Sequence, residues 1–165
     1  VFSAALKKEI LPGRDYAAMI ASTTLLNTPG AELGAIEGVH AVTDVTGFGL
    51  LGHLAEVCRG SGVAARIRRA DIPVFAGARR LVSEGVRTGA SPRNWASLAA
   101  MIDPPADWSE ADRDILCDPQ TSGGLLVSCA PTAAEDVLEL FRRHGHDAAA
   151  IIGETGAGSP KISID

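Results

Sequence analysis

Two short polar segments of this sequence carry residue types that hold a metal ion and a phosphate group. In the first, Asp44 lies between Thr43 and Thr46, and Gly47 and Gly49 follow directly. Mg²⁺ prefers one or two carboxylates together with phosphate oxygens and water, and a glycine-rich turn that opens a helix presents backbone N–H groups to phosphate. The segment therefore indicates a place where phosphate-bound Mg²⁺ meets the protein, with Asp44 as the metal ligand. The alternative is that Asp44 only caps a helix or forms a turn.

The same glycines also fit a different chemistry. Gly47, Gly49 and Gly52 have the spacing of the dinucleotide-binding motif, and Asp71 follows at about the separation that this motif requires. Asp44 argues against a nicotinamide dehydrogenase, because a carboxylate repels a pyrophosphate by about 4 kcal/mol per charge pair at about 4 Å in an effective dielectric of about 20. A divalent cation between the two anions reverses this repulsion, so the metal–phosphate interpretation is favoured.

The second polar segment runs from Cys117 to Gly124. It contains Asp118 before a proline, Thr121 next to a serine, and a pair of glycines at its end. Asp-Pro starts turns, hydroxyl groups donate hydrogen bonds, and glycine permits a close approach of two backbones. The segment has the residues of a polar site loop, but taken alone it favours a simple connection between two strands.

The remaining polar residues give weaker signals. Arg93, in the loop Gly85–Asn94, can bind a phosphate with two parallel hydrogen bonds, although a lone arginine in a loop more often lies free on the surface. His40 and His53 have no cysteine or histidine at metal-ligand spacing, which favours packing or surface roles. No Gly-x-Ser-x-Gly elbow and no pairing of a nucleophile with a base is present. The chain has a candidate metal–phosphate anchor without a nucleophile.

Composition narrows the class of protein. The 165 residues are 46% hydrophobic and 21% charged with a net charge of −5, which predicts one folded domain and argues against unaided nucleic-acid binding. No apolar run reaches the length of about 20 residues that spans a membrane, and no signal peptide is recognisable. Cys58, Cys117 and Cys129 lack zinc-site spacing and are expected to be reduced, buried thiols. We expect a cytoplasmic chain, and its start at Val1 rather than Met suggests part of a longer protein.

The elements that must position these residues follow from the hydrophobic pattern. Helices are expected at 16–26, 50–59, 73–84, 95–102 and 131–143, and strands at 39–43, 63–69, 115–117, 125–129, 148–153 and 161–164. Helices first, then two strand–helix–strand blocks joined by a helical excursion, predict an α+β domain with helices packed on a mixed sheet.

The two polar segments together resemble a known family. Residues 41–54 read AVTDVTGFGLLGHL and residues 118–126 read DPQTSGGLL, and both are similar to the C-terminal half of selenophosphate synthetase (selenide, water dikinase). Residues 89–94, GASPRN, are similar to a Gly-Gly-Thr-x-Arg-Asn pattern of that family, from which Ala90 and Ser91 depart. The resemblance covers essentially the whole chain and extends to a superfamily that includes aminoimidazole ribonucleotide synthetase, thiamine-monophosphate kinase and a hydrogenase maturation protein.

The resemblance implies a fold, an activity and partners. The fold is that of the aminoimidazole ribonucleotide synthetase C-terminal domain, with partly ferredoxin-like topology, and residues 1–165 form one domain of a two-domain, dimeric protein. The activity implied is conversion of ATP, selenide and water to selenophosphate, AMP and phosphate, in selenium metabolism. Asp44 matches the position that ligates Mg²⁺, and the cysteine or selenocysteine nucleophile belongs to an N-terminal domain outside this chain, so that none of the three cysteines inherits that role. The residues expected on the phosphate side are Thr43, Thr46, Gly47, Gly49, Asp118 and Thr121. No nucleic-acid or membrane partner is expected.

Two other readings stay open beside this one. A superfamily relative that uses a different phosphate acceptor would share the same segments. The chain could also act by itself as a binding or assembly module without catalysis, because it lacks the chemical groups of the absent domain.

Overall fold

A computed structural model describes all 165 residues. The helices are α1 (Phe2–Lys7), α2 (Gly13–Thr24), α3 (Gly30–Leu33), α4 (Gly49–Ser61), α5 (Ala76–Ser83), α6 (Ser91–Leu98), α7 (Glu110–Leu116) and α8 (Ala134–Arg143). The strands are β1 (Val39–Asp44), β2 (Val63–Ile67), β3 (Ile102–Asp103), β4 (Leu125–Cys129), β5 (Gly153–Ala157) and β6 (Ile162–Ile164). Short 3-10 helices occupy Arg69–Asp71, Ala99–Met101 and Pro131–Ala133.

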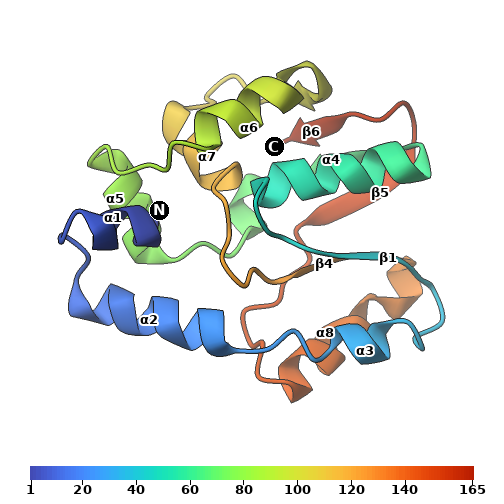
Figure 1. Cartoon of the computed structure of the whole chain (residues 1–165). Helices are drawn as coiled ribbons and strands as arrows, with labels where there is room; N and C mark the ends of the chain where they lie inside the picture. Colours follow the sequence, from blue (N-terminus) through green and yellow to red (C-terminus); the bar gives the residue numbers. More distant parts are fainter.

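The strands form two sheets (Figure 1). β1 and β4 make an antiparallel pair, and the other four strands make a mixed sheet in the order β3-β6-β2-β5. In that mixed sheet β2 runs antiparallel to β5 and parallel to β6, and β3 runs parallel to β6. The predicted α+β class, with helices packed on a mixed sheet, is therefore confirmed.

Two strand–helix–strand units underlie this arrangement. The first is β1-α4-β2 and the second is β4-α8-β5. Each strand of the first unit pairs with the corresponding strand of the second, β1 with β4 and β2 with β5. β1 and β2 thus belong to different sheets although one helix joins them, and the connection across α4 carries the chain from one sheet to the other.

The core follows from the apolar face of α4. Leu51, Leu54, Ala55 and Cys58 are buried at the three- and four-residue spacing of one helix face, and they pack with β2 and β6 in the largest apolar cluster. The helix ends where Gly62 adopts a left-handed φ of +65°, as the sequence predicts. On the opposite face of the β1–β4 pair, α3 and α8 close a smaller cluster (Figure 1).

Three sequence predictions of local structure are wrong. Residues 115–117, expected as a strand, lie at the end of α7, which begins with a capping box between Ser109 and Asp112. A short apolar run does not by itself distinguish a strand from a buried helix end. The strand expected at 148–153 lies later, at β5, and the loop expected at 85–94 ends early because α6 begins at Ser91.

β5 contains no large apolar residue. Its position follows from pairing with β2 along its whole length, and Gly153 comes so close that an added Cβ would lie 2.1 Å from the Arg66 carbonyl oxygen. No helix of the chain combines the length and the apolar character that crossing a membrane requires.

Candidate functional site

Asp44 is the last residue of β1, directly opposite Leu125 of β4. Its side chain is exposed, and its carboxylate makes neither a hydrogen bond nor an ion pair within the chain. A free carboxylate is a hard oxygen donor, which fits the one- or two-carboxylate pattern of protein-bound Mg²⁺. No group of three or more histidine, cysteine, aspartate or glutamate side chains gathers to hold a metal, so a metal at Asp44 would need further ligands beside this carboxylate.

The turn after Asp44 is held by His53. The Thr46 backbone N–H donates to Nε2 of His53 at 3.0 Å, and the Thr46 hydroxyl lies 3.1 Å from the same nitrogen. Because an amide can only donate, Nε2 accepts, which leaves the proton of the neutral ring on Nδ1. Sequence reasoning favoured a packing or surface role for His53, and its position in α4, one turn beyond Gly49, was the available signal for the contact with Thr46.

Gly49 brings the first segment against the second. It opens α4 with a φ of +70°, and a Cβ there would lie 2.6 Å from the carbonyl carbon of Cys117. Both the left-handed backbone and the close approach require glycine. The helix start predicted to face phosphate is therefore fixed beside the beginning of the Cys117–Gly124 segment.

Two backbone hydrogen bonds join the segments further along. Gln120 N–H donates to the Thr46 carbonyl, and Val45 N–H donates to the Gly124 carbonyl, each at 2.9 Å. A Cβ at Gly123 would lie 1.7 Å from the Val45 carbonyl oxygen. The structure thus brings together two polar segments that are far apart in the sequence, next to the strand end that carries Asp44.

Asn94 ties both segments to a third. Its buried amide nitrogen donates to the Gly47 carbonyl and to the Cys117 carbonyl, each at 3.0 Å, and so uses both of its hydrogens. Sequence reasoning placed Asn94 in a polar loop without a role. Only the resemblance of residues 89–94 to the family pattern pointed to it.

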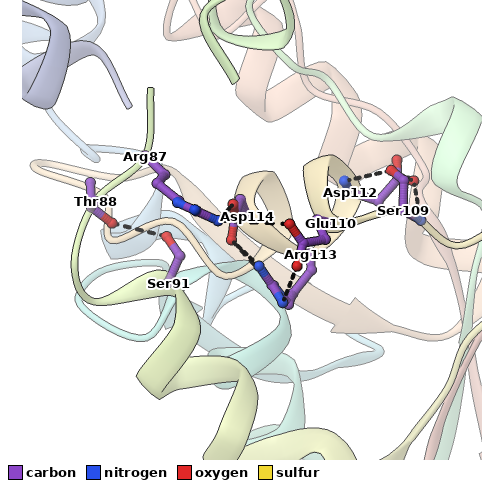
Figure 2. Close-up of polar contacts among 8 residues, drawn as sticks. All are labelled: Arg87, Thr88, Ser91, Ser109, Glu110, Asp112, Arg113 and Asp114. Carbon is purple, nitrogen blue, oxygen red and sulfur yellow. Dashed lines mark hydrogen bonds and ion pairs between the residues drawn. The ribbon is translucent and has the colours of Figure 1, made fainter. Parts of the chain in front are cut away.

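The third loop is anchored by hydroxyls and charges (Figure 2). The Thr88 and Ser91 hydroxyls lie 2.9 Å apart, and Arg87 lies 3.5 Å from the buried carboxylate of Asp114 in α7. Arg113 pairs with the same carboxylate at 3.1 Å. The Arg87–Asp114 contact thus links this loop to α7, and the Thr88–Ser91 contact lies at the start of α6, the helix that carries Asn94. Arg93 is exposed and makes no ion pair.

The other predicted residues divide between surface and interior. Thr43 is part-buried and its hydroxyl donates to the Asp44 carbonyl at 3.2 Å, while Thr121 is exposed. Asp118 is buried, with Oδ2 2.5 Å from the Val1 nitrogen and Oδ1 without a partner. Loss of hydration on burial raises the pKa of Asp118, and the polar side chains of Thr88 and Gln120 oppose that rise. Asp118 therefore faces the interior, whereas Thr121 faces solvent.

The cysteines lack the environment of a nucleophile. Burial raises the pKa of Cys117 to about 12 and also raises the pKa of Cys58 and of Cys129. A thiol that stays protonated at neutral pH is a poor nucleophile. This fits the expectation that none of the three carries out the chemistry.

Fold and site together define the class of protein. Residues 18–165 match the model of the family described as AIR synthase related protein, C-terminal domain, and the chain belongs to this family.

The curated relatives are more specific. The chain is 52% identical over 164 residues to a selenide, water dikinase of Paraburkholderia xenovorans and 51% identical to one of Dechloromonas aromatica. These matches cover 99% of the chain but 46% and 47% of the two relatives. The chain thus spans about half the length of the curated relatives it matches.

Solved structures share the fold at low sequence identity. E. coli HypE, a hydrogenase maturation protein, superposes with a TM-score of 0.58 at 22% identity, over 83% of this chain and 35% of HypE. A thiamine-monophosphate kinase from Stenotrophomonas maltophilia superposes with a TM-score of 0.55 at 20% identity, over 84% of this chain and 34% of the kinase. These similarities support the fold assignment.

Proposed function

We propose that this chain is the C-terminal domain of a two-domain selenide, water dikinase, which converts ATP, selenide and water to selenophosphate, AMP and phosphate. The observation that carries the proposal is the identity of about half of all residues, along nearly the whole chain, to proteins of that name. The unpaired carboxylate of Asp44, beside two joined polar segments, supports the proposal because it is a group that can bind Mg²⁺. A dimeric state and a cytoplasmic location stay predictions.

In the proposed reaction, this domain helps to bind Mg²⁺ and to position the phosphates. Phosphoryl transfer depends chiefly on placing the phosphates and neutralising their oxygens. Asp44 would hold Mg²⁺ on the phosphate side, and bound Mg²⁺ would neutralise triphosphate charge. The first turn of α4, fixed by Gly49 and His53, directs its positive end to the same side. Thr43, Thr46, Gly47 and Thr121 complete the proposed phosphate-side surface.

The remaining requirements belong to the other half of the proposed protein. The family resemblance assigns the nucleophile, and most contacts to the nucleotide, to an N-terminal domain, and this chain covers 46% and 47% of the two relatives. We therefore expect the isolated chain to show no dikinase activity. A superfamily enzyme with another phosphate acceptor is the competing assignment.

The test uses the longer protein with ATP, Mg²⁺ and selenide. Phosphorus NMR should show a selenium-coupled phosphate signal together with AMP. Asp44→Asn should lower the rate by at least about 100-fold, the size expected when a charge-stabilising group is removed. Asp147→Asn is the matched control, since Asp147 is also exposed and unpaired, and it should leave the rate unchanged. ATP turnover without AMP or a selenium-coupled signal would assign the protein to the competing class.

A further inference from the structure

We propose that Asn27 is a positioning residue for this site. Its side-chain amide holds the loop of residues 118–124 against the strand end that carries Asp44. The geometric part of the inference stands on the fold, and its consequence for metal binding rests on the proposed function. Neither the sequence segments nor the family resemblance pointed to this residue.

Asn27 reaches the loop from a distant part of the chain. It lies in the connection between α2 and α3, and its part-buried Nδ2 donates to the Gly123 carbonyl at 2.7 Å, across 96 positions of sequence. Within the loop, the Gln120 side chain bonds only to Asp118. Asn94 reaches the Cys117 carbonyl just before the loop, so Asn27 is the one side chain from elsewhere in the chain that hydrogen-bonds to the backbone of residues 118–124.

The bonded peptide is the one that touches the Asp44 strand. Gly123 packs so closely on the Val45 carbonyl that no side chain fits between them. The next carbonyl, that of Gly124, accepts the Val45 N–H, and Leu125 then pairs with Asp44. A rotation of the Gly123 peptide would displace the acceptor of Val45, the residue directly after Asp44.

The residues on either side of Asn27 contact two histidines, His144 and His146, that follow the end of α8. His144 contacts the Thr28 hydroxyl through Nδ1 at 2.9 Å and Glu32 through Nε2 at 2.7 Å. His146 contacts the Leu26 carbonyl through Nε2 at 3.3 Å. These contacts hold the chain before and after Asn27 against the end of α8. The position of the Asn27 amide is therefore set by α8 and not by the loop to which it donates.

The first test measures the loop itself by amide hydrogen exchange of this chain. Asn27→Asp keeps the shape of the side chain but replaces the donor by an acceptor, and Asn27→Ala removes it. Both should speed exchange at Val45 and Gln120 by about tenfold, the size expected for one lost hydrogen bond. Thr24→Val is the control, because the Thr24 hydroxyl bonds only to carbonyls of its own helix, α2, and not to the loop or to the residues that hold Asn27. Unchanged exchange at Val45 and Gln120, or an equal rise at Leu140 in α8, would overturn the inference.

The second test measures the consequence for the metal. In the longer protein with ATP, Mn²⁺ binding followed by electron paramagnetic resonance should weaken by up to about tenfold in Asn27→Asp, in line with the effect of residues that orient metal ligands. It should stay unchanged in Thr24→Val. Unaltered Mn²⁺ binding in Asn27→Asp would overturn the link to Asp44. Faster exchange in a protein that makes no selenophosphate would instead keep the inference and overturn the proposed function.

Discussion

At the scale of single residues, the two adjacent glycines of the second polar segment have different reasons to be glycine. An added Cβ at Gly123 would meet the Val45 carbonyl oxygen, whereas a Cβ at Gly124 would meet nothing within 4 Å. The sequence motif gives both residues equal weight. Only the close approach of a second chain segment separates them.

Gly123→Ala should therefore destabilise the chain strongly. Forcing a methyl group into a packed contact costs about 1–3 kcal/mol, and here the neighbouring atom belongs to backbone that has no room to move. Urea unfolding followed by circular dichroism measures the change. Gly124→Ala is the matched control and should shift the midpoint little, so equal shifts for the two variants would contradict the contact between Gly123 and Val45.

At the same scale, the two carboxylates that the sequence singled out lie in different surroundings. Asp44 and Asp118 each sit in a polar motif, and both were expected near phosphate. Asp44 is exposed and unpaired, but Asp118 is buried with a raised pKa. Of the two, only Asp44 faces solvent, where its carboxylate oxygens are open to a cation.

At the scale of elements, α6 holds the two polar segments of the site together. Its first turn carries Asn94, whose amide joins the backbone of the first polar segment at Gly47 to that of the second at Cys117. α6 also packs against both α4 and α7. The helix thus fixes the distance between the two segments that its neighbours carry.

Asn94→Ala should remove the hydrogen bonds by which α6 joins the two polar segments and so destabilise the chain. It leaves two buried or part-buried carbonyl groups without a donor, at a cost of about 2 kcal/mol or more. The free energy of unfolding in urea measures the loss. Arg93→Ala serves as the control, since Arg93 is exposed and unpaired on the same helix. A loss no larger than that of Arg93→Ala would show that the two carbonyls find other donors.

At the scale of the whole molecule, burial is uneven. α4 lies in the largest core cluster and buries six of its residues, while α2 buries only Asp15. The outer side of α2 leaves Tyr16 and Ile20 exposed, and Leu26 beyond it is 71% exposed. Figure 1 shows α2 at the margin of the fold, joined to the rest through α1 and the connection to α3.

This uneven burial predicts uneven local stability. A helix of twelve residues is marginal in water without packing, and segments with few buried contacts open at low free energy. In hydrogen exchange, amides of α2 should exchange at least about 100-fold faster than those of the buried face of α4. Comparable protection of the two helices would mean that another surface covers α2 in solution.

Much of the architecture could be predicted from local pattern. The apolar spacing from Leu51 to Cys58 and the stop at Gly62 define α4, and the runs at 39–43 and 125–129 are strands as expected. The pattern failed at Ile115–Cys117, where a short apolar run is the buried end of a helix, and at β5, whose small residues carry no hydrophobic signal. At β5, pairing with β2 outweighs local propensity, whereas at 115–117 an apolar run this short does not distinguish a strand from a buried helix end.

For the site, the sequence by itself determined which residues have the chemistry: a carboxylate among hydroxyls and glycines, and a second polar turn. Only the tertiary structure decided which of these residues lie close together and which other side chains position them. His53, Asn94 and Asn27 act through hydrogen bonds to backbone groups of other segments. Such bonds leave no periodicity in the sequence. The His53 bond spans only seven residues, but the amides of Asn94 and Asn27 acquire their partners only when the tertiary fold brings distant carbonyls within reach.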